Sequence, residues 1–295
     1  MRSFDEYKSL IEDNLTSFLP DPGEHAGILR ESMAYSLSIG GKRIRPVLLL
    51  ASCDAAGGDV TAALPYACAI EFIHTYSLIH DDLPAMDDDD MRRGKPSNHK
   101  VYGEAMAILA GDGLLSSAAE LIAGQALPLK GDKDALYAHS MAAFEILTRA
   151  GASGMIAGQT ADVANEGKEA SPGLVRFIEE HKTADLLTAP VRAGLMLAGA
   201  SEDMIKDFTT YAYNLGIAFQ ILDDILDYEG SSELMGKTLG KDIEQDKCSY
   251  VNVHGMNAAR SELGRLTDEA KSAISSYDNS AFFIELADKL ENRNH

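Results

Sequence analysis

Six aspartates gather in one short stretch of the sequence, from His80 to Gly94, which reads HDDLPAMDDDDMRRG. Carboxylate oxygens at this density suit Mg²⁺, whereas the two adjacent arginines, Arg92 and Arg93, suit an anion. A site that takes a divalent cation and an anion together is typical of a phosphorylated ligand. An acidic run by itself can equally be a solvated turn, so the interpretation depends on a second cluster further along the chain.

The second acidic cluster is FQILDDILD, residues 219–227, which contains Asp223, Asp224 and Asp227. Asp223 and Asp227 are four residues apart, so on a helix both carboxylates project from one face. They could belong to an acidic surface helix, but the flanking residues are apolar and predict a mostly buried helix, where unpaired charge is costly. The pattern therefore favours a metal ion at each of the two clusters.

The first cluster has a different spacing, because Asp81 and Asp87 are six residues apart and would lie about 120° apart on an ideal helix. Pro84 should end or bend that helix, since its ring clashes with the carbonyl of residue 80 and biases Leu83 away from the helical region. We expect the bend to bring Asp87 back toward Asp81. Two carboxylate sets facing across a helical bundle could hold several Mg²⁺ ions around one diphosphate, which would help to remove that group from carbon.

Composition narrows the class of protein. The chain has 295 residues, 45% of them hydrophobic, and 46 acidic residues against 26 basic ones give a net charge of −20. Nucleic acids and anionic membranes are unexpected partners, because both require clustered Lys and Arg. No apolar run approaches 18 residues and the N-terminus carries acids, so we expect no membrane insertion and no targeting signal. The three cysteines, Cys53, Cys68 and Cys248, suggest reduced, buried thiols in a cytosolic protein.

The elements that must position these side chains are helices. Apolar residues recur at helical spacing, Ser3 and Glu6 form a capping box, and Pro190 predicts a kink or break inside a later helix. No period-2 strand stands out, and residues 230–247 are predicted to form a loop. We therefore predict an all-α protein, one helical bundle of roughly ten helices that forms a single domain over residues 1–295.

Longer motifs resemble a known family. They are GGKRIRP at 40–46, residues 71–99 with both arginines, GEAMAILAGDGLL, GQTAD at 158–162, HKTADLL at 181–187, FQILDDILD and MGKTLGKDIEQDK at 235–247. Their content and order resemble trans-prenyl diphosphate synthases, and most closely the bacterial farnesyl diphosphate synthases. The resemblance covers nearly the whole chain. It implies an isoprenoid synthase bundle around a central cavity, a cytoplasmic location and a homodimer.

The resemblance also implies roles for individual residues. Three Mg²⁺ ions, with Mn²⁺ as an alternative, would be bound by Asp81, Asp82, Asp87, Asp223, Asp224 and Asp227. The allylic diphosphate would contact Arg92, Lys182, Lys237 and Lys247, and isopentenyl diphosphate would contact Lys42, Arg45, His74 and Arg93. Asp88, Asp89 and Asp90 would be solvated or supporting. His74 alone, on an apolar helix, could also be an ordinary core histidine.

The implied reaction is ionisation of the allylic carbon–oxygen bond, attack by the isopentenyl double bond, and proton loss to the departing diphosphate. Lys182, Thr183 and Gln220 would be catalytic, with Thr183 and Gln220 directing oxygen dipoles at the cation. Gln159 and Asp162 are expected either to orient basic side chains or to form a structural pair. Gly111 and Asp112 match the family motif without an assigned role.

Product length depends on the residues just before the first cluster. Tyr76 and Ser77 lie five and four residues before Asp81. An aromatic residue there, with the two-residue insertion in the aspartate motif, resembles farnesyl synthases and predicts a C15 product. The alternatives are a C20 or C10 synthase, a class I terpene cyclase and a non-catalytic partner subunit.

Overall fold

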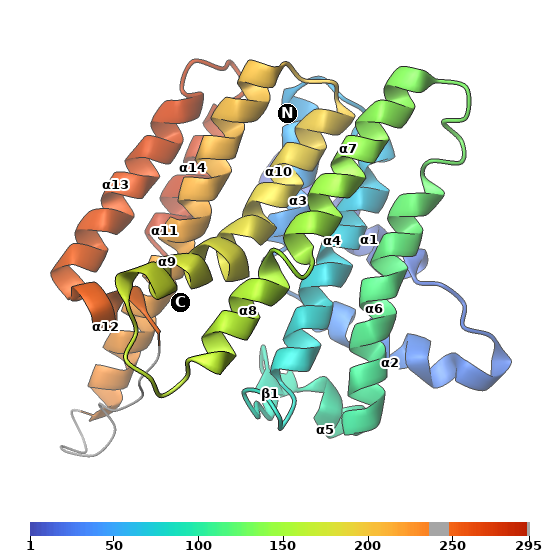
Figure 1. The fold of residues 1–295 in the computed structure, drawn as a ribbon. Coiled ribbons are helices and arrows are strands. Elements are labelled where there is room, and N and C mark those ends of the chain that lie inside the picture. Colours follow the sequence, from blue (N-terminus) through green and yellow to red (C-terminus); the bar gives the residue numbers. More distant parts are fainter. Residues whose placement is uncertain (236–247, 294–295) are drawn as a thin grey trace. The chain divides into compact units, whose positions relative to one another are not determined.

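The computed structural model describes residues 1–235 and 248–293, which are helical almost throughout (Figure 1). The all-α prediction is confirmed. The chain divides into two compact units: Met1–Leu147 with Arg192–Ala200, and Thr148–Val191 with Ser201–His295. Whether residues 1–295 behave as one domain stays a prediction.

The first unit is built on two long helices, α4 (Val60–Asp81) and α6 (Glu104–Gly124), which lie side by side (Figure 1). Around them are α1 (Phe4–Asn14), α2 (Gly27–Ser38), α3 (Ile44–Ala55), α5 (Asn98–Tyr102), most of α7 (Lys133–Ala150) and the short 3₁₀ turns Leu15–Phe18 and Glu24–Ala26. Helix α4 is apolar on every side and almost wholly buried, as expected of a central helix.

The capping box predicted at the first helix is present. The Ser3 hydroxyl accepts a hydrogen bond from the Glu6 backbone, and the Glu6 carboxylate accepts one from the Ser3 backbone at 2.7 Å. These reciprocal bonds satisfy two N–H groups that have no partner within the helix.

A small hairpin is the exception to the prediction that the chain has no strands. Strands β1 (Met91–Arg92) and β2 (Lys95–Pro96) pair antiparallel, with Arg92 opposite Lys95. The two turn residues, Arg93 and Gly94, both have positive φ, 52° and 77°. This is the combination that a two-residue type I′ turn requires, and two-residue strands are too short for an alternating pattern to reveal them.

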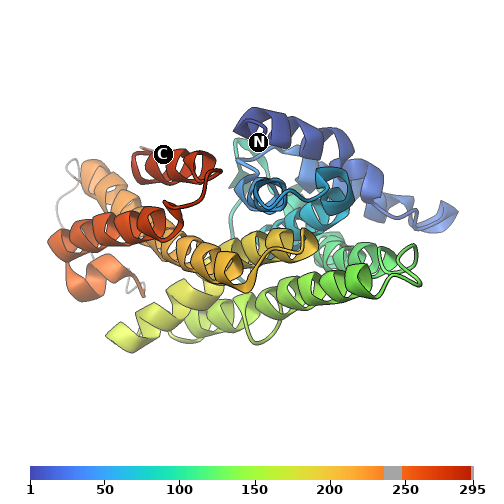
Figure 2. The same cartoon turned by 90° about the horizontal axis from the view of Figure 1, so that it is seen from above.

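In the second unit, α11 (Glu202–Met235), α13 (Met256–Ile274) and α14 (Ala281–Glu291) lie side by side (Figures 1 and 2). The other elements are α8 (Met155–Ala164), α9 (Pro172–Ile178), the π-helix η3 (Glu179–Ala184), the first part of α10 (Asp185–Leu197) and α12 (Tyr250–His254). Within this unit, η3 packs against both α8 and α11.

Three predictions about these helices need correction. Helix α10 continues through Pro190, and the irregular turn lies earlier, in η3. Helix α11 runs on to Met235, so residues 230–235 are helical and not part of a loop as predicted, while the rest of the predicted loop, up to residue 247, lies outside the described residues. Cys248 is only half-buried, whereas Cys53 and Cys68 are buried as predicted. Burial raises the pKa of the Cys53 thiol to about 12, so this sulfur is held protonated.

Helix α6 is the one helix in the described part of the chain that is long and apolar enough to cross a membrane by length and composition, with a mean hydropathy of 1.4. Three acids interrupt it: Glu104, Asp112 and Glu120. Its buried side packs on α4 and α2, so the same composition also describes a core helix.

Candidate active site

The first aspartate motif forms a turn at the end of α4. The helix ends at Asp81, and the Asp87 backbone N–H then donates to the Asp81 carbonyl at 2.9 Å. The predicted bend around Pro84 is therefore present, and it returns Asp87 to Asp81. Asp81 is half-buried and Asp87 is exposed. Their carboxylates are an oxygen-only donor set, which fits Mg²⁺.

Asp82, the next residue after Asp81, is paired with Arg92. Arg92 Nε donates to both oxygens of the buried Asp82 carboxylate, at 2.9 and 3.3 Å, and Nη2 donates as well. Burial raises the pKa of Asp82, and the Arg92 guanidinium opposes that rise. The sequence placed these two residues in separate roles, as a metal ligand and a phosphate ligand. The structure joins them, so the pair first serves to hold the hairpin against the end of α4.

Basic side chains gather around His74, on α4. Arg45 Nη1 lies 3.4 Å from His74 Nε2. Burial lowers the pKa of His74 well below its ordinary value, and the positive charges of Arg45, Arg93, Arg43 and Arg92 lower it further. The imidazole is therefore neutral at pH 7. A neutral ring beside several guanidinium groups is suited to bind an anion without metal.

The loop at residues 40–43 completes this cluster. Arg93 donates to the Gly40 carbonyl, and a Cβ added to Gly41 would lie 2.4 Å from Arg93 Nη1. Only glycine allows the guanidinium to lie this close to the loop. Lys42 is exposed on the same loop. The structure thus brings Arg45, His74 and Arg93 together, with Lys42 on the loop that Arg93 contacts.

Arg43 is a structural residue that the sequence did not reveal. It has a left-handed backbone, with φ of 53°, and its buried side chain donates to Glu71 and to the Leu37 carbonyl, both at 2.6 Å. This pair turns Arg43 inward between Lys42 and Arg45. A possible signal was Glu71, an acid in the apolar helix α4, which needs a partner when buried.

The residues predicted to set product length are packed near His80. Tyr76 is buried and makes an edge-on contact with the His80 ring, with 5.8 Å between ring centroids. The Ser77 hydroxyl donates to the His74 carbonyl at 2.9 Å, so it is bound to its own helix. Burial raises the pKa of Tyr76 to about 12, which keeps its hydroxyl neutral.

The same contacts give Gly111 a role that the sequence left open. A Cβ at Gly111 would lie 2.1 Å from His80 Nε2, and that nitrogen is 3.1 Å from the Ile108 carbonyl. Gly111 therefore makes room for the His80 ring between α4 and α6. Asp112 faces the same ring, with its carboxylate 3.9 Å from Nε2.

In the second unit, two of the three predicted catalytic residues, Thr183 and Gln220, belong to a hydrogen-bonded chain. Thr183 Oγ1 donates to Gln220 Oε1 at 2.6 Å, Gln220 Nε2 donates to Asp224 Oδ1 at 3.0 Å, and the Tyr250 backbone N–H donates to Asp224 Oδ2 at 2.7 Å. Asp224 is thus held by α11 and α12, and its carboxylate orients Gln220. Burial raises the pKa of Asp224 to about 6.

Lys182 and Thr183 both lie on η3, and single π-helical turns of this kind are frequent at functional sites. Lys182 Nζ donates to Asp162 Oδ2 at 2.6 Å, which is the contact expected of Asp162 as an orienting residue. A Cβ at Gly158 would lie 2.2 Å from the Lys182 backbone nitrogen, so glycine permits α8 to approach η3. The matching role of Gln159 stays a prediction, and Lys237 and Lys247 lie outside the described residues.

Asp223, a predicted metal ligand, is paired with Arg293 near the end of the described chain. The guanidinium also lies 3.9 Å from the centre of the Phe219 ring. Arg293 is a second residue that the sequence reasoning missed, and its position along the chain gave no signal of this contact. Asp227, one turn further along α11, is exposed.

Glu179, at the start of η3, is a buried carboxylate with an unusual environment. Neither oxygen has a hydrogen-bond partner among the residues that the structure describes. Burial and the negative charge of Asp224 raise the pKa of Glu179 to about 8, while Arg176, 3.9 Å away, lowers it. The side chain is therefore mostly protonated at pH 7.

This environment predicts a pH-dependent stability. The folded-state pKa of Glu179, about 8, lies above the ordinary value of 4.5, so the native state binds the extra proton between these values and loses stability as pH rises. Each unit of the rise is worth roughly 1.4 kcal/mol. Urea unfolding from pH 5 to 8 should show a flatter profile and higher stability at pH 8 for Glu179→Gln. The exposed Glu285→Gln exchange should leave the wild-type slope intact. Parallel profiles for wild type and Glu179→Gln would contradict this assignment.

Comparison with known proteins agrees with the geometry. The chain is 46% identical to a geranylgeranyl diphosphate synthase of Cyanophora paradoxa, covering 98% of this chain and 95% of that protein. It is 42% identical to a farnesyl diphosphate synthase of Bacillus subtilis, covering 98% and 96%. The structure is similar to an apo farnesyl/geranylfarnesyl diphosphate synthase of Zymomonas mobilis, with a TM-score of 0.84, 31% identity and coverage of 96% and 95%.

The family model described as polyprenyl synthetase matches residues 26–281, which include both aspartate motifs, the arginine hairpin and η3. The match and the relatives together settle the family, and the chain belongs to the polyprenyl synthetases.

Proposed function

We propose that the chain is a prenyltransferase that condenses dimethylallyl or geranyl diphosphate with isopentenyl diphosphate, head to tail, to give farnesyl diphosphate. The observation that carries the proposal is the basic cluster around His74, where Arg45 lies 3.4 Å from a neutral imidazole and Arg93 adds a second guanidinium group. Prenyl transfer needs two diphosphates treated differently, since one must leave and the other must stay on its carbon.

The proposed Mg²⁺ ligands are the aspartates of both motifs: Asp81, Asp82, Asp87, Asp223, Asp224 and Asp227. Mg²⁺, when bound, neutralises the charge of the departing diphosphate. The donor chemistry of Asp81, Asp87 and Asp227 supports this, because these carboxylates are at least partly exposed. Asp82 and Asp224 hold Arg92 and Gln220 in the described structure, so we assign them first to positioning.

The isopentenyl diphosphate would be bound by Lys42, Arg45, His74 and Arg93. Arginine offers bidentate hydrogen bonds to phosphate oxygens, and the neutral His74 ring can donate one more. The allylic diphosphate would contact Arg92 and Lys182, each already oriented by a carboxylate, together with Lys237 and Lys247. Charge that is held in place before the substrate arrives lowers the cost of binding.

The carbocation would form near Thr183 and Gln220, which the Asp224 carboxylate holds in place. Their oxygen dipoles can stabilise positive charge as it develops, and the surrounding apolar side chains exclude water that would quench it. No side-chain nucleophile is needed, because the isopentenyl double bond attacks the cation and the departing diphosphate takes the proton.

Two rival activities are disfavoured by particular residues. A class I terpene cyclase would not need the anion site around His74, and a non-catalytic partner subunit would not need to retain both aspartate motifs. The proposal also includes a cytoplasmic location, which rests on the resemblance and on the three cysteines read as reduced thiols, and no membrane insertion. The absence of nucleic-acid partners rests on the net charge of −20.

The basic cluster predicts which substrate depends on Arg45. Arg45→Gln should raise KM for isopentenyl diphosphate roughly 10- to 100-fold, since a charge-assisted hydrogen bond contributes about 1.5–3 kcal/mol. KM for the allylic substrate should change by less than about threefold, because that diphosphate does not contact Arg45. Steady-state kinetics with Mg²⁺ measure both, with the exposed Lys95→Gln exchange as the matched control. A product that forms without isopentenyl diphosphate would identify a cyclase instead.

Tyr76 predicts the product. Wild-type protein, given dimethylallyl and isopentenyl diphosphates with Mg²⁺, should release mainly the C15 product, with C20 and C10 as minor components. Tyr76→Ala should lengthen it to C20 or beyond, because removing a buried ring deepens the cavity floor, whereas Tyr76→Phe keeps the ring and should keep C15. Mass spectrometry of the products decides the matter. A wild-type enzyme that makes mainly C20 product would contradict the assignment of farnesyl diphosphate as the product.

A homodimer is proposed from the resemblance and from the exposed face of α7. Tyr137 and Phe144, seven residues apart on one side of this helix, are 67% and 64% exposed. Phe144→Glu should weaken association at least tenfold, as measured by sedimentation equilibrium. Leu127→Glu, which also changes an exposed apolar residue, should leave the mass unchanged. A wild-type monomer at micromolar concentration would contradict the dimer.

A further inference from the structure

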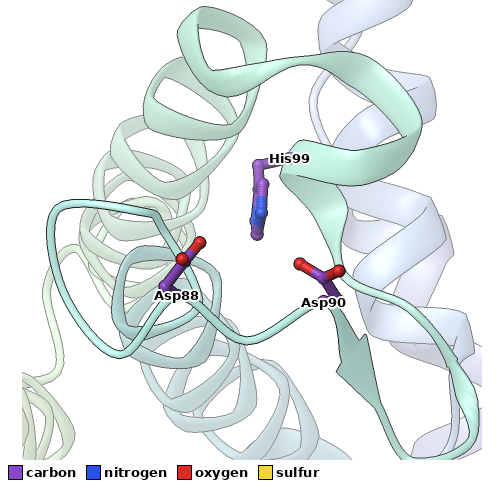
Figure 3. A group of neighbouring side chains, drawn as sticks. All are labelled: Asp88, Asp90 and His99. Atoms are coloured by element: carbon purple, nitrogen blue, oxygen red, sulfur yellow. The ribbon is translucent and has the colours of Figure 1, made fainter.

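Three side chains that the proposed reaction does not use converge beside the arginine hairpin. They are Asp88 and Asp90, from the aspartate turn, and His99, from the start of α5. One ligand atom of each lies within 4.8 Å of the others, and Figure 3 shows the His99 ring pointing toward the space between the two carboxylates. All three belong to the first unit.

His99 carries the stronger part of the argument. The residue is only 7% exposed, and its Nε2 has no hydrogen-bond partner anywhere in the described parts of the chain. A buried ring nitrogen without a partner is costly, and most such groups in proteins bind a polar group, a water or an ion. His99, whose ring points toward the two carboxylates, thus has one ring nitrogen, Nε2, that lacks a partner among the described residues.

The other ring nitrogen is already engaged. Ser97 Oγ lies 3.1 Å from His99 Nδ1, and the Ser97 backbone N–H donates to the Asp90 carbonyl at 2.9 Å. If Nδ1 donates to Ser97, Nε2 keeps its lone pair available, which is the tautomer that binds a metal through Nε2. The Ser97 backbone also fixes Asp90 beside the ring.

We propose that Asp88, Asp90 and His99 form a separate site for a transition metal ion of the Zn²⁺ type. An imidazole with two carboxylates suits Zn²⁺, Co²⁺ or Mn²⁺, whereas Mg²⁺ prefers oxygen alone. Two atoms bound to one such ion lie at most about 4.2 Å apart, since each bond is about 2.1 Å. Because both aspartates are exposed, small rotations of their side chains close the remaining gap.

The positive charge of Lys100 competes with a metal ion for Asp90. Lys100 Nζ lies 2.6 Å from Asp90 Oδ1, but its side chain is 41% exposed. An exposed ion pair contributes about 1 kcal/mol or less, so a metal bound by three ligands can displace it. The ion would join the aspartate turn, which precedes the β1–β2 hairpin, to α5, which follows it. It would thereby hold together the two ends of the hairpin that carries Arg92 and Arg93. Its role is to position these arginines, not to take part in the reaction.

Cobalt(II) provides the test, because its visible absorption reports nitrogen ligation and geometry. Purified full-length protein, without substrate and in excess Mg²⁺ to fill the oxygen-only motifs, should bind one Co²⁺ with a visible band that Zn²⁺ removes. Asp88→Ala and His99→Gln should each weaken Co²⁺ binding at least tenfold. Asp89→Ala, which removes an equal charge from the same turn outside the cluster, should change affinity by less than about twofold.

Asp88→Ala keeps the test decisive if the buried His99→Gln exchange fails to fold, because Asp88 is exposed. Equal Co²⁺ binding by wild type and Asp88→Ala would overturn the proposal, as would loss of the band in Asp223→Asn. Prenyl transfer is assayed separately with Mg²⁺ alone, so failure of this site and failure of the proposed function give different results.

Discussion

The ion pair between the buried Asp82 and the half-buried Arg92 is the interaction on which the arginine hairpin of the first unit depends. It joins the end of α4 to the β1–β2 hairpin through two hydrogen-bonding directions, which fixes orientation as well as distance. Breaking it from one side would leave a buried charge without its partner, which costs about 3–5 kcal/mol. The hairpin then presents Arg93 to the glycine loop.

The second constraint is the close approach of neighbouring elements to one another, which three glycines make possible. Side chains at Gly41, Gly111 and Gly158 would overlap with Arg93, His80 and the η3 backbone. Each glycine therefore lets a neighbouring element lie nearer than ordinary packing allows. A methyl group at Gly41 or Gly158 would have to displace Arg93 or the backbone of Lys182, both of which the proposed reaction uses, and one at Gly111 would displace the His80 ring.

Much of this arrangement was predictable from local chemistry. The bend after Asp81 followed from Pro84, the cap at Ser3 from its spacing to Glu6, and the helical class from apolar periodicity. What could not be predicted depended on contacts between distant residues. Nothing near Arg293 points to Asp223, and the stretch around Arg92 contains six aspartates without indicating that Asp82 is the one it binds. The π-helix was also hidden, because Pro190 is a stronger local signal than any in residues 179–184.

The hydrogen bonds among Thr183, Gln220, Asp224 and Tyr250 all run toward the Asp224 carboxylate, which accepts from the Tyr250 backbone on one side and from Gln220 on the other. Gln220 Nε2 donates to the carboxylate, and the Gln220 carbonyl oxygen accepts the hydrogen bond from Thr183, whose hydroxyl has only one hydrogen to donate. The negative charge of Asp224 thus polarises Gln220 and, through it, the Thr183 hydroxyl, without any proton transfer. The Thr183 oxygen can then act only as a hydrogen-bond acceptor toward another group.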